Sequence, residues 1–250
     1  MIRIGFNNFL FLPRRGWLID VGCREFLLPK IAAKWGMKVI AVDPAPDIST
    51  PEGQNIFYEQ LAIVGSRKDK TAEFYVTADK QTSYLEGAGI SAAGKCGERK
   101  QPLERGEVVT VSAMTLEELL SKYGLDHVEV LKLNCEGSEE EILLNLKRPL
   151  AHQISVEFHR HLGFSGFTSE IRNHMGTWYD WLASAEDRPF ERVIFYLKGD
   201  RRLYMFAMLA KAQLFLSFPF YAARKLFYKW VWDKNFAKRI RFYIKRRLGL

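Results

Sequence analysis

The chain has 250 residues, of which 48% are hydrophobic and 26% are charged. That composition is typical of a globular protein with a substantial core, and it excludes a disordered, collagen-like or small disulfide-stapled chain. The three cysteines, Cys23, Cys96 and Cys135, form no Cys-x-x-Cys pair and are odd in number. Neither a disulfide framework nor a zinc site is therefore indicated, and the sequence favours a reducing, cytoplasmic setting.

The excess positive charge is concentrated at the C-terminus. Residues 211–250 contain 11 Lys and Arg and one acidic residue, Asp233, which gives a net charge of +10. The other 210 residues contain 26 Lys and Arg and 28 Asp and Glu, which gives −2. The charge pattern therefore predicts a nearly neutral body, residues 1–210, followed by a basic appendage, residues 211–250.

No segment predicts a secretory signal or a membrane span. The apolar start of the chain is interrupted by Asn7 and Asn8, and no small-residue cleavage site follows. The apolar stretch Ala212–Ala223 has 12 residues, whereas a spanning helix needs about 20. We therefore expect a protein that does not cross a membrane.

The first part of the body alternates strands with a helix. Residues 17–21, WLIDV, and residues 38–42, KVIAV, are short apolar runs typical of buried parallel strands. A helix is expected between them, over residues 28–35, and Gly36 follows it. Two further strands are predicted, near residues 56–64 and 71–77.

A long loop is expected over residues 83–106, which contain five glycines and no periodic pattern. A loop of that length inside a compact domain is usually a functional lid or a surface excursion. The sequence leaves both interpretations open.

Two helices are predicted by the spacing of a capping box, in which side chains satisfy free amides at a helix start. Thr115 and Glu118 have this spacing, and Ser138 and Glu141 repeat it. Strands are predicted around these helices, at residues 107–112, 128–133 and 154–158.

The end of the body predicts a helix and then a hairpin. Residues 168–184 have helical spacing of their apolar side chains, and residues 192–197 and 203–208 flank a break at Lys198-Gly199-Asp200. Strands that alternate with helices and end in an antiparallel pair indicate an α/β fold. We predict a Rossmann-like, doubly wound, mostly parallel sheet with a terminal antiparallel strand.

Polar residues follow the predicted strands at the edge where doubly wound sheets bind ligands. Asp20 and Gly22 end the first strand, and Asp43, one βαβ step later, ends the second. An acid there can accept hydrogen bonds from both hydroxyls of a ribose, and Gly22 is expected to let the backbone approach a cofactor closely. The Gly-x-Gly-x-x-Gly fingerprint is absent, because residues 23–26 read Cys-Arg-Glu-Phe. We therefore expect a nucleoside cofactor without phosphates.

These residues also carry a family resemblance. Residues 17–44, WLIDVGCREFLLPKIAAKWGMKVIAVDP, resemble motif I and the next strand of class I S-adenosylmethionine-dependent methyltransferases. More narrowly, the chain is similar to the FkbM-type family. Three further segments match that family's motifs in order, namely Met114-Thr115-Leu116-Glu117, the stretch LKLNCEGSEEEIL at 131–143, and Val156–His159.

The resemblance implies a methyltransferase that uses S-adenosylmethionine and transfers the methyl group to oxygen, often on a sugar or polyketide hydroxyl. It also implies which residues bind the donor. By position these are Asp20, Gly22 and Cys23 beside the methionine part, Asp43 with Pro44 beside the ribose, Ala62 and Ile63 near the adenine, and Asn134 and Glu136 beside the sulfonium or the acceptor.

A hydroxyl acceptor benefits from a base within hydrogen-bond reach. Glu136, Glu157 and His159 are the candidates at the expected sheet edge, and the imidazole of His159 titrates closest to neutral pH. Other interpretations stay open at this point. Glu136 could instead complement the start of the helix that follows it, and His159 could lie in a solvated loop.

The chain departs from the family pattern at two positions. Phe26 stands where the family usually has the third glycine of motif I, and Asn134 stands where it usually has Asp. The ring of Phe26 could crowd the cofactor or pack the helix onto the sheet. The amide of Asn134 removes a charge that could bind a cation or orient the acceptor.

The basic appendage alternates aromatic and cationic residues. Eleven of the 40 residues in 211–250 are Phe, Trp or Tyr. Cationic and apolar residues recur there at helical spacing, namely Lys234, Lys238, Arg241 and Lys245 beside Phe236, Ile240, Ile244 and Leu248. This pattern predicts basic amphipathic helices and favours an anionic bilayer surface. A partner protein or packing on the body comes second, and nucleic acid is less favoured.

The favoured hypothesis is an O-methyltransferase that acts on a hydroxyl of a carbohydrate or lipid-linked saccharide, cytoplasmic and peripheral at the inner face of a membrane. The first alternative is a catalytically silent, membrane-associated scaffold with the same fold, which Phe26 and Asn134 motivate. The second is an RNA methyltransferase that uses the basic appendage.

Overall fold

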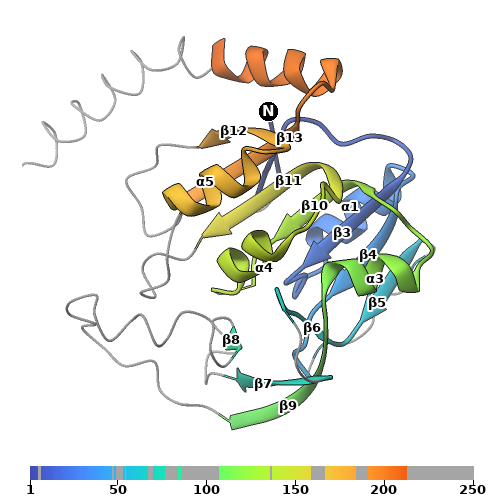
Figure 1. The fold of residues 1–250 in the computed structure, drawn as a ribbon. Helices are drawn as coiled ribbons and strands as arrows, with labels where there is room; N and C mark the ends of the chain where they lie inside the picture. Colours follow the sequence, from blue (N-terminus) through green and yellow to red (C-terminus); the bar gives the residue numbers. More distant parts are fainter. Residues whose placement is uncertain are drawn as a thin grey trace, which may run out of the picture. The chain divides into compact units, whose positions relative to one another are not determined.

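The structure is a computed structural model, shown in Figure 1. It describes residues 1–4, 7–46, 48, 53, 55–66, 70–76, 84–85, 107–135, 137–158, 167–183 and 191–212. The chain divides into two compact units, Met1–Ala207 and Met208–Leu250. Within the second unit the structure describes residues 208–212, which are helical.

A seven-stranded sheet forms the centre of the first unit, with the order β12-β13-β11-β10-β3-β4-β5. Its strands are β3 (Trp17–Val21), β4 (Lys38–Val42), β5 (Ile56–Glu59), β10 (Val128–Leu133), β11 (Ala151–Phe158), β12 (Tyr179–Ala183) and β13 (Glu191–Leu197). The five strands from β11 to β5 are parallel, whereas β13 and β12 are antiparallel. The prediction of a mostly parallel, doubly wound sheet that ends antiparallel is confirmed.

The strand order identifies the edge at which this sheet binds ligands. The chain forms β3, β4 and β5 in one direction across the sheet and then returns to the other side of β3 to form β10 and β11. The connections therefore diverge between β3 and β10. Ligands of open α/β sheets bind outside the carboxyl ends of the strands at such a point.

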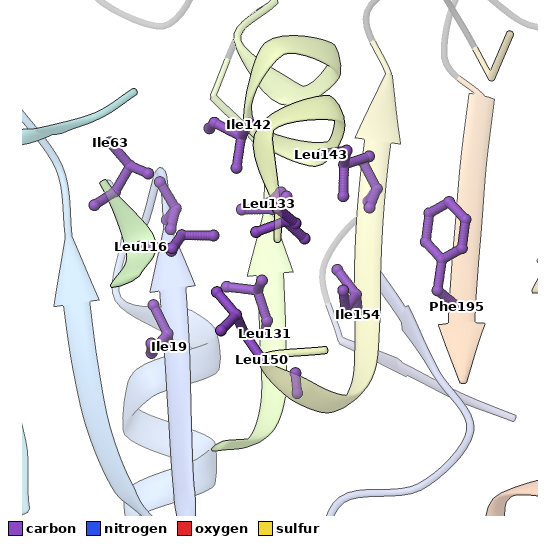
Figure 2. Close-up of a cluster of buried hydrophobic side chains, with 14 of the residues drawn as sticks. Ile19, Ile63, Leu116, Leu131, Leu133, Ile142, Leu143, Leu150, Ile154 and Phe195 are labelled. Atoms are coloured by element: carbon purple, nitrogen blue, oxygen red, sulfur yellow. The ribbon is translucent and has the colours of Figure 1, made fainter. Parts of the chain in front are cut away.

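Helices cover both faces of the sheet. The helices α3 (Leu116–Lys122), α4 (Glu139–Asn145) and α5 (Ser169–Met175) contribute to one large apolar core, and α1 (Leu27–Lys34) packs on the opposite face. In Figure 2, Ile142 and Leu143 of α4 lie over Leu133 of β10. Ile154 and Phe195 continue the same core toward the antiparallel strands (Figure 2).

Two smaller sheets accompany the central one and were not predicted. One has the order β6-β9-β7-β8, and the other is an antiparallel hairpin of β1 and β2. Their strands are β1 (Ile2–Ile4), β2 (Asn7–Phe9), β6 (Ala62–Ile63), β7 (Thr71–Val76), β8 (Tyr84–Leu85) and β9 (Glu107–Met114). Outside β8, the predicted loop at 83–106 lies beyond the described residues.

Two predictions about the end of the body are wrong. Residues 203–208 belong to a helix over 201–212, because Asp200 Oδ1 accepts the amides of Arg202 and Leu203 and so caps a helix start. The helix predicted over 168–184 ends at Met175, and residues 179–183 form β12 instead. The antiparallel hairpin of β12 and β13 therefore lies one element earlier than predicted.

One of the two predicted capping boxes forms. The hydroxyl of Thr115 accepts the amide of Glu118 at 3.2 Å, and the Glu118 carboxylate accepts the amide of Thr115 at 2.9 Å. Ser138 makes no capping bond, because its backbone is already helical, with a ψ of −5° where Thr115 has 166°. Glu141, its expected partner, accepts the amide of Ser66 instead.

In the part of the chain that the structure describes, no helix is both long and apolar enough to cross a bilayer.

Candidate functional site

The carboxyl ends of the parallel strands bring the predicted polar residues to one edge of the sheet. Asp20 lies near the end of β3, Asp43 directly follows β4, and Asn134 directly follows β10. Glu157 lies near the end of β11. β3 has β4 on one side and β10 on the other, so Asp20, Asp43 and Asn134 come from three neighbouring strands at the topological switch point.

A buried lysine organises the first of these positions. Lys132 of β10 is directly opposite Asp20 in the parallel register, and its Nζ lies 2.8 Å from Asp20 Oδ1. The same Nζ donates to the carbonyls of Val21 at 3.0 Å and Gly22 at 2.7 Å. Burial lowers the pKa of Lys132, but the charge of Asp20 and its hydrogen bond outweigh this and raise the pKa overall, so the ammonium stays protonated. Lys132 therefore holds both the acid and the turn that follows it.

The turn at Gly22 lies in close contact with Asn134, the residue that follows β10. Gly22 has a φ of +77°, and a Cβ built on it would lie 1.8 Å from the carbonyl oxygen of Asn134. The amide of Gly22 donates to Val42, and that of Asn134 donates to Val21. Glycine is required here by a contact within the protein as well as by its backbone conformation, whereas the sequence argument gave close approach of a cofactor as the reason.

Cys23 and Phe26 pack inward beneath the start of α1. Both are buried, in a cluster with Ala41 of β4, and the Phe26 ring makes an edge contact with Tyr58 at 5.4 Å between centroids. Phe26 has a φ of +52°, a left-handed conformation that glycine would adopt without strain. Of the two alternatives for Phe26, the structure shows the one in which the ring packs helix against sheet.

The Cys23 thiol is surrounded by negative charge. Burial raises its pKa strongly, and the nearby carboxylates of Asp20 and Asp43 raise it further. A thiol in this environment stays protonated and is a poor nucleophile. Lys132 joins Asp20 to the carbonyl of Gly22, and Asp43 accepts the amide of Arg24, so the two acids flank the same turn.

Asp43 is held by the backbone on both oxygens. Its Oδ1 accepts the amide of Ala45 at 3.0 Å, and its Oδ2 accepts the amide of Arg24 at 3.1 Å. Burial raises the pKa of Asp43, whereas these two amides and the charge of Arg24 act in the opposite direction. Each carboxylate oxygen has two lone pairs and can accept a further donor, so the residue is fixed in place and retains acceptor capacity.

The loop after β10 is fastened by a residue that the sequence analysis did not select. Glu139, at the start of α4, accepts the amide of Cys135 at 2.8 Å with one oxygen and the amide of Gly137 at 2.8 Å with the other. Asn134 Oδ1 is buried and has no hydrogen-bond partner among the described residues. Glu136, the candidate base of this loop, lies outside the residues that the structure describes.

Glu157 is paired with a cation. Its Oε1 accepts from Arg192 of β13 at 3.1 Å, and both side chains are buried. The pairing follows from the antiparallel register, in which Glu157 is directly opposite Arg192. A carboxylate tied to a buried guanidinium is held in a fixed orientation. His159 lies outside the described residues.

The remaining candidates lie beside this edge. Pro44 is half-buried between Asp43 and Ala45. Ala62 packs with Ala45 and Phe74, and the Ile63 side chain joins the main apolar core, visible in Figure 2. In the described ranges, no group of His, Cys, Asp or Glu side chains is arranged to hold a metal ion.

Comparison with known proteins identifies the family. Residues 20–189 match the methyltransferase FkbM domain, a span that contains the Asp20 turn, Asp43 and the β10 loop. The chain belongs to the FkbM methyltransferase family. Its reaction is methyl transfer that depends on S-adenosylmethionine.

No curated protein matches. One similar structure is a TehB-like SAM-dependent methyltransferase from Corynebacterium glutamicum. The two chains are 11% identical with a TM-score of 0.37, and the match covers 74% of this chain and 82% of the other.

The residues of this FkbM domain fit the donor. S-adenosylmethionine has ribose hydroxyls and an amino group that donate hydrogen bonds, and the switch point has acceptors for them. Among the described residues, each oxygen of Asp43 accepts one amide and has a further lone pair, and Asn134 has a buried side-chain oxygen with no partner in those ranges. Buried polar atoms in native proteins are normally hydrogen-bonded, so an unpartnered oxygen at this edge is consistent with a site that a ligand completes.

Proposed function

We propose that this FkbM-family protein transfers a methyl group from S-adenosylmethionine to a hydroxyl oxygen of a carbohydrate or lipid-linked saccharide. The observation that carries the proposal is the placement of Asp20 and Asp43 at the ends of adjacent parallel strands, around one turn at the switch point. Membership of the FkbM family supports the choice of an oxygen acceptor.

In the proposed site, each acid has a separate task. Asp43 accepts hydrogen bonds from the ribose hydroxyls, with Pro44 beside it. Asp20 and Lys132 fix the turn of Gly22 and Cys23 next to the methionine part of the donor. Asn134 offers its side-chain oxygen, for which the described residues supply no partner, on the side of the sulfonium or the acceptor, and Ala62 and Ile63 lie toward the adenine.

The chemistry asked of the protein is mainly alignment. The bound donor supplies a methyl group that its sulfonium has already activated. The protein has to hold the acceptor oxygen in line with it, which is an entropic contribution of several kcal/mol. We propose Glu136 and His159 as the groups that accept the hydroxyl proton. Glu157, held by Arg192, acts as a positioning residue for them.

Calorimetric titration with S-adenosylhomocysteine tests the donor site. Asp43→Asn should weaken binding at least about tenfold, since hydrogen bonds to a charged acceptor contribute about 1.5–3 kcal/mol each. Asp126→Asn is the matched control, because Asp126 is exposed and lies before β10, at the other end of the strand. It should bind as the unchanged protein does.

The same titration can be repeated over a pH range. Burial raises the pKa of Asp43, so protonation should begin at a higher pH than for an exposed aspartate. Affinity should therefore fall as the pH is lowered through that raised pKa. Absence of binding by the intact protein would contradict the proposal and favour the silent scaffold.

We also propose that residues 211–250 attach the protein peripherally to an anionic membrane surface. The net charge of +10 and the 11 aromatic residues of this segment support the proposal. An acidic partner protein and RNA are the alternatives. The proposed setting is the cytoplasmic face of the membrane, where a lipid-linked saccharide would present its hydroxyls.

A further inference from the structure

The helix over residues 201–212 exposes an apolar stripe. Tyr204, Met205, Met208 and Leu209 are 55%, 54%, 48% and 60% exposed. These four are among ten large hydrophobic side chains that are exposed in the described ranges, and no other element has as many. At 3.6 residues per turn they lie on one side of the helix. Scattered exposed apolar residues need no explanation, but a contiguous stripe indicates an interaction surface.

The stripe and the buried side of this helix are distinct. Leu203 and Ala207, on the opposite side, are buried. Phe206 stacks on Phe11 with a centroid distance of 5.4 Å and an interplanar angle of 10°. Asp200 caps the helix start. The helix therefore has a buried side and an exposed side, and the stripe is the exposed one.

Cations flank the stripe and acids are absent from the helix. The sequence of 201–212, RRLYMFAMLAKA, contains Arg201, Arg202 and Lys211, all exposed, and no Asp or Glu. Arg202 is partly neutralised by Asp200, at 3.5 Å. Exposed apolar side chains bordered by cations are the pattern of a helix that lies in the interface of an anionic bilayer.

The apolar stripe could be covered by residues 213–250 or by a membrane, and the charge of residues 213–250 favours the membrane. Residues 213–250 continue with a large excess of Lys and Arg. A cationic segment is repelled by the flanking Arg201 and Lys211, which disfavours its packing on the stripe, whereas both segments are attracted to the same negative surface. We propose that the helix over 201–212 is the first element of a membrane-docking surface, with Tyr204, Met205, Met208 and Leu209 inserted among the lipids of an anionic bilayer.

This inference extends the proposed membrane attachment from residues 211–250 to a helix whose exposed side chains are described. It does not depend on methyl transfer, so its test uses vesicle binding alone. Co-sedimentation of the full-length protein with vesicles of phosphatidylcholine is compared with vesicles that contain about one-third phosphatidylglycerol. Binding is expected to the anionic vesicles and not to the neutral ones.

The decisive variant is Met205→Glu with Met208→Glu, which places two carboxylates in the middle of the stripe. The control is Trp35→Glu with Val108→Glu, which makes the same charge change at two hydrophobic residues of similar exposure on other elements. The stripe variant should lose at least about tenfold in vesicle affinity, whereas the control should keep most of it. Thermal unfolding of each variant checks that it is folded.

A second variant removes apolar surface without changing charge. Tyr204→Ser with Leu209→Ser should weaken binding several-fold while leaving net charge unaltered. Equal vesicle binding by the stripe variant and the control overturns the inference, as does failure of the unchanged protein to bind anionic vesicles. It is also overturned if the protein binds poly(U) RNA more tightly than vesicles. A dimer in solution that the stripe variant converts to a monomer would assign the stripe to a second copy of the chain.

Discussion

The turn at Gly22 and Cys23 is held by a buried cation, Lys132. Its ammonium group is shared between Asp20 and the carbonyls of Val21 and Gly22. Burying a charge is costly unless it is paired, and here the ammonium and the carboxylate pair at 2.8 Å. Removing one member of such a pair leaves an uncompensated charge in the interior.

Lys132→Met should destabilise the protein by about 3–5 kcal/mol, because it leaves Asp20 buried without its partner. It should also weaken S-adenosylhomocysteine binding, because the turn loses its anchor. Lys122→Met is the matched control, since Lys122 pairs with Glu59 at 2.6 Å while remaining half-exposed, and exposed pairs contribute about 0–1 kcal/mol. Urea denaturation measures both variants, and equal losses would contradict the assignment.

Some site residues can be predicted from the spacing of strands in the sequence, whereas others depend on contacts that form only in the fold. Asp20, Gly22 and Asp43 follow apolar runs at βαβ spacing, and parallel strands end at one edge, so their location could be predicted. Lys132 and Glu139 could not be selected in that way, because their partners come from register and loop closure. A signal for Lys132 does exist, since a lysine inside the apolar run VEVLKL needs a buried partner.

At the scale of the element, the two similar helix starts behave differently. Thr115 has an extended backbone and caps α3, whereas Ser138 has a helical backbone and its hydroxyl is buried without a partner in the described ranges. The Ser/Thr-x-x-Glu pattern is therefore insufficient. The backbone conformation of the first residue determines whether its side chain can reach the amides.

Thr115→Ala should lower the free energy of unfolding by about 1 kcal/mol, since it removes a working cap. Ser138→Ala is the matched comparison and should be neutral or slightly stabilising, because no described residue bonds its buried hydroxyl. Chemical denaturation of the two variants gives the comparison. A larger loss for Ser138→Ala than for Thr115→Ala would show that Ser138 has a partner at this position.

The strands and helices of the parallel part could be predicted because their apolar runs are strongly periodic and their ends are marked by Gly, Pro or capping residues. The antiparallel end could not. Residues 203–208 satisfy both a strand and a helix pattern, and the capping carboxylate of Asp200 decides for the helix. Tertiary pairing also decides for residues 179–183, whose helical spacing is overridden by pairing with β13.

At the scale of the whole molecule, charge and the candidate donor site are segregated along the chain. Every residue proposed to bind the methyl donor lies within residues 20–136, whereas residues 211–250 carry a net charge of +10. Asp20 and Asp43, the two acids of the proposed donor site, are buried, and surface charges are screened by salt much more than buried ones.

The concentration of salt should therefore affect membrane binding and donor binding differently. Raising the NaCl concentration from about 0.05 to about 0.5 M shortens the Debye length to a few Å and should abolish most binding to anionic vesicles. S-adenosylhomocysteine affinity should change by less than about threefold, because the charged groups of the proposed site, Asp20 and Asp43, are buried. Calorimetry and vesicle sedimentation on the same preparation check both. A parallel loss of the two would show that the cationic segment contributes to donor binding.

The contact between Gly22 and Asn134 also constrains how this protein can be altered. A methyl group at position 22 has no room unless the main chain after β10 moves away. In a relative with a side chain there, we expect a compensating rearrangement of that second segment. Attempts to engineer a different donor or acceptor should therefore vary the turn at Gly22 and the segment after β10 in one library. A larger side chain in one of these segments would overlap the other.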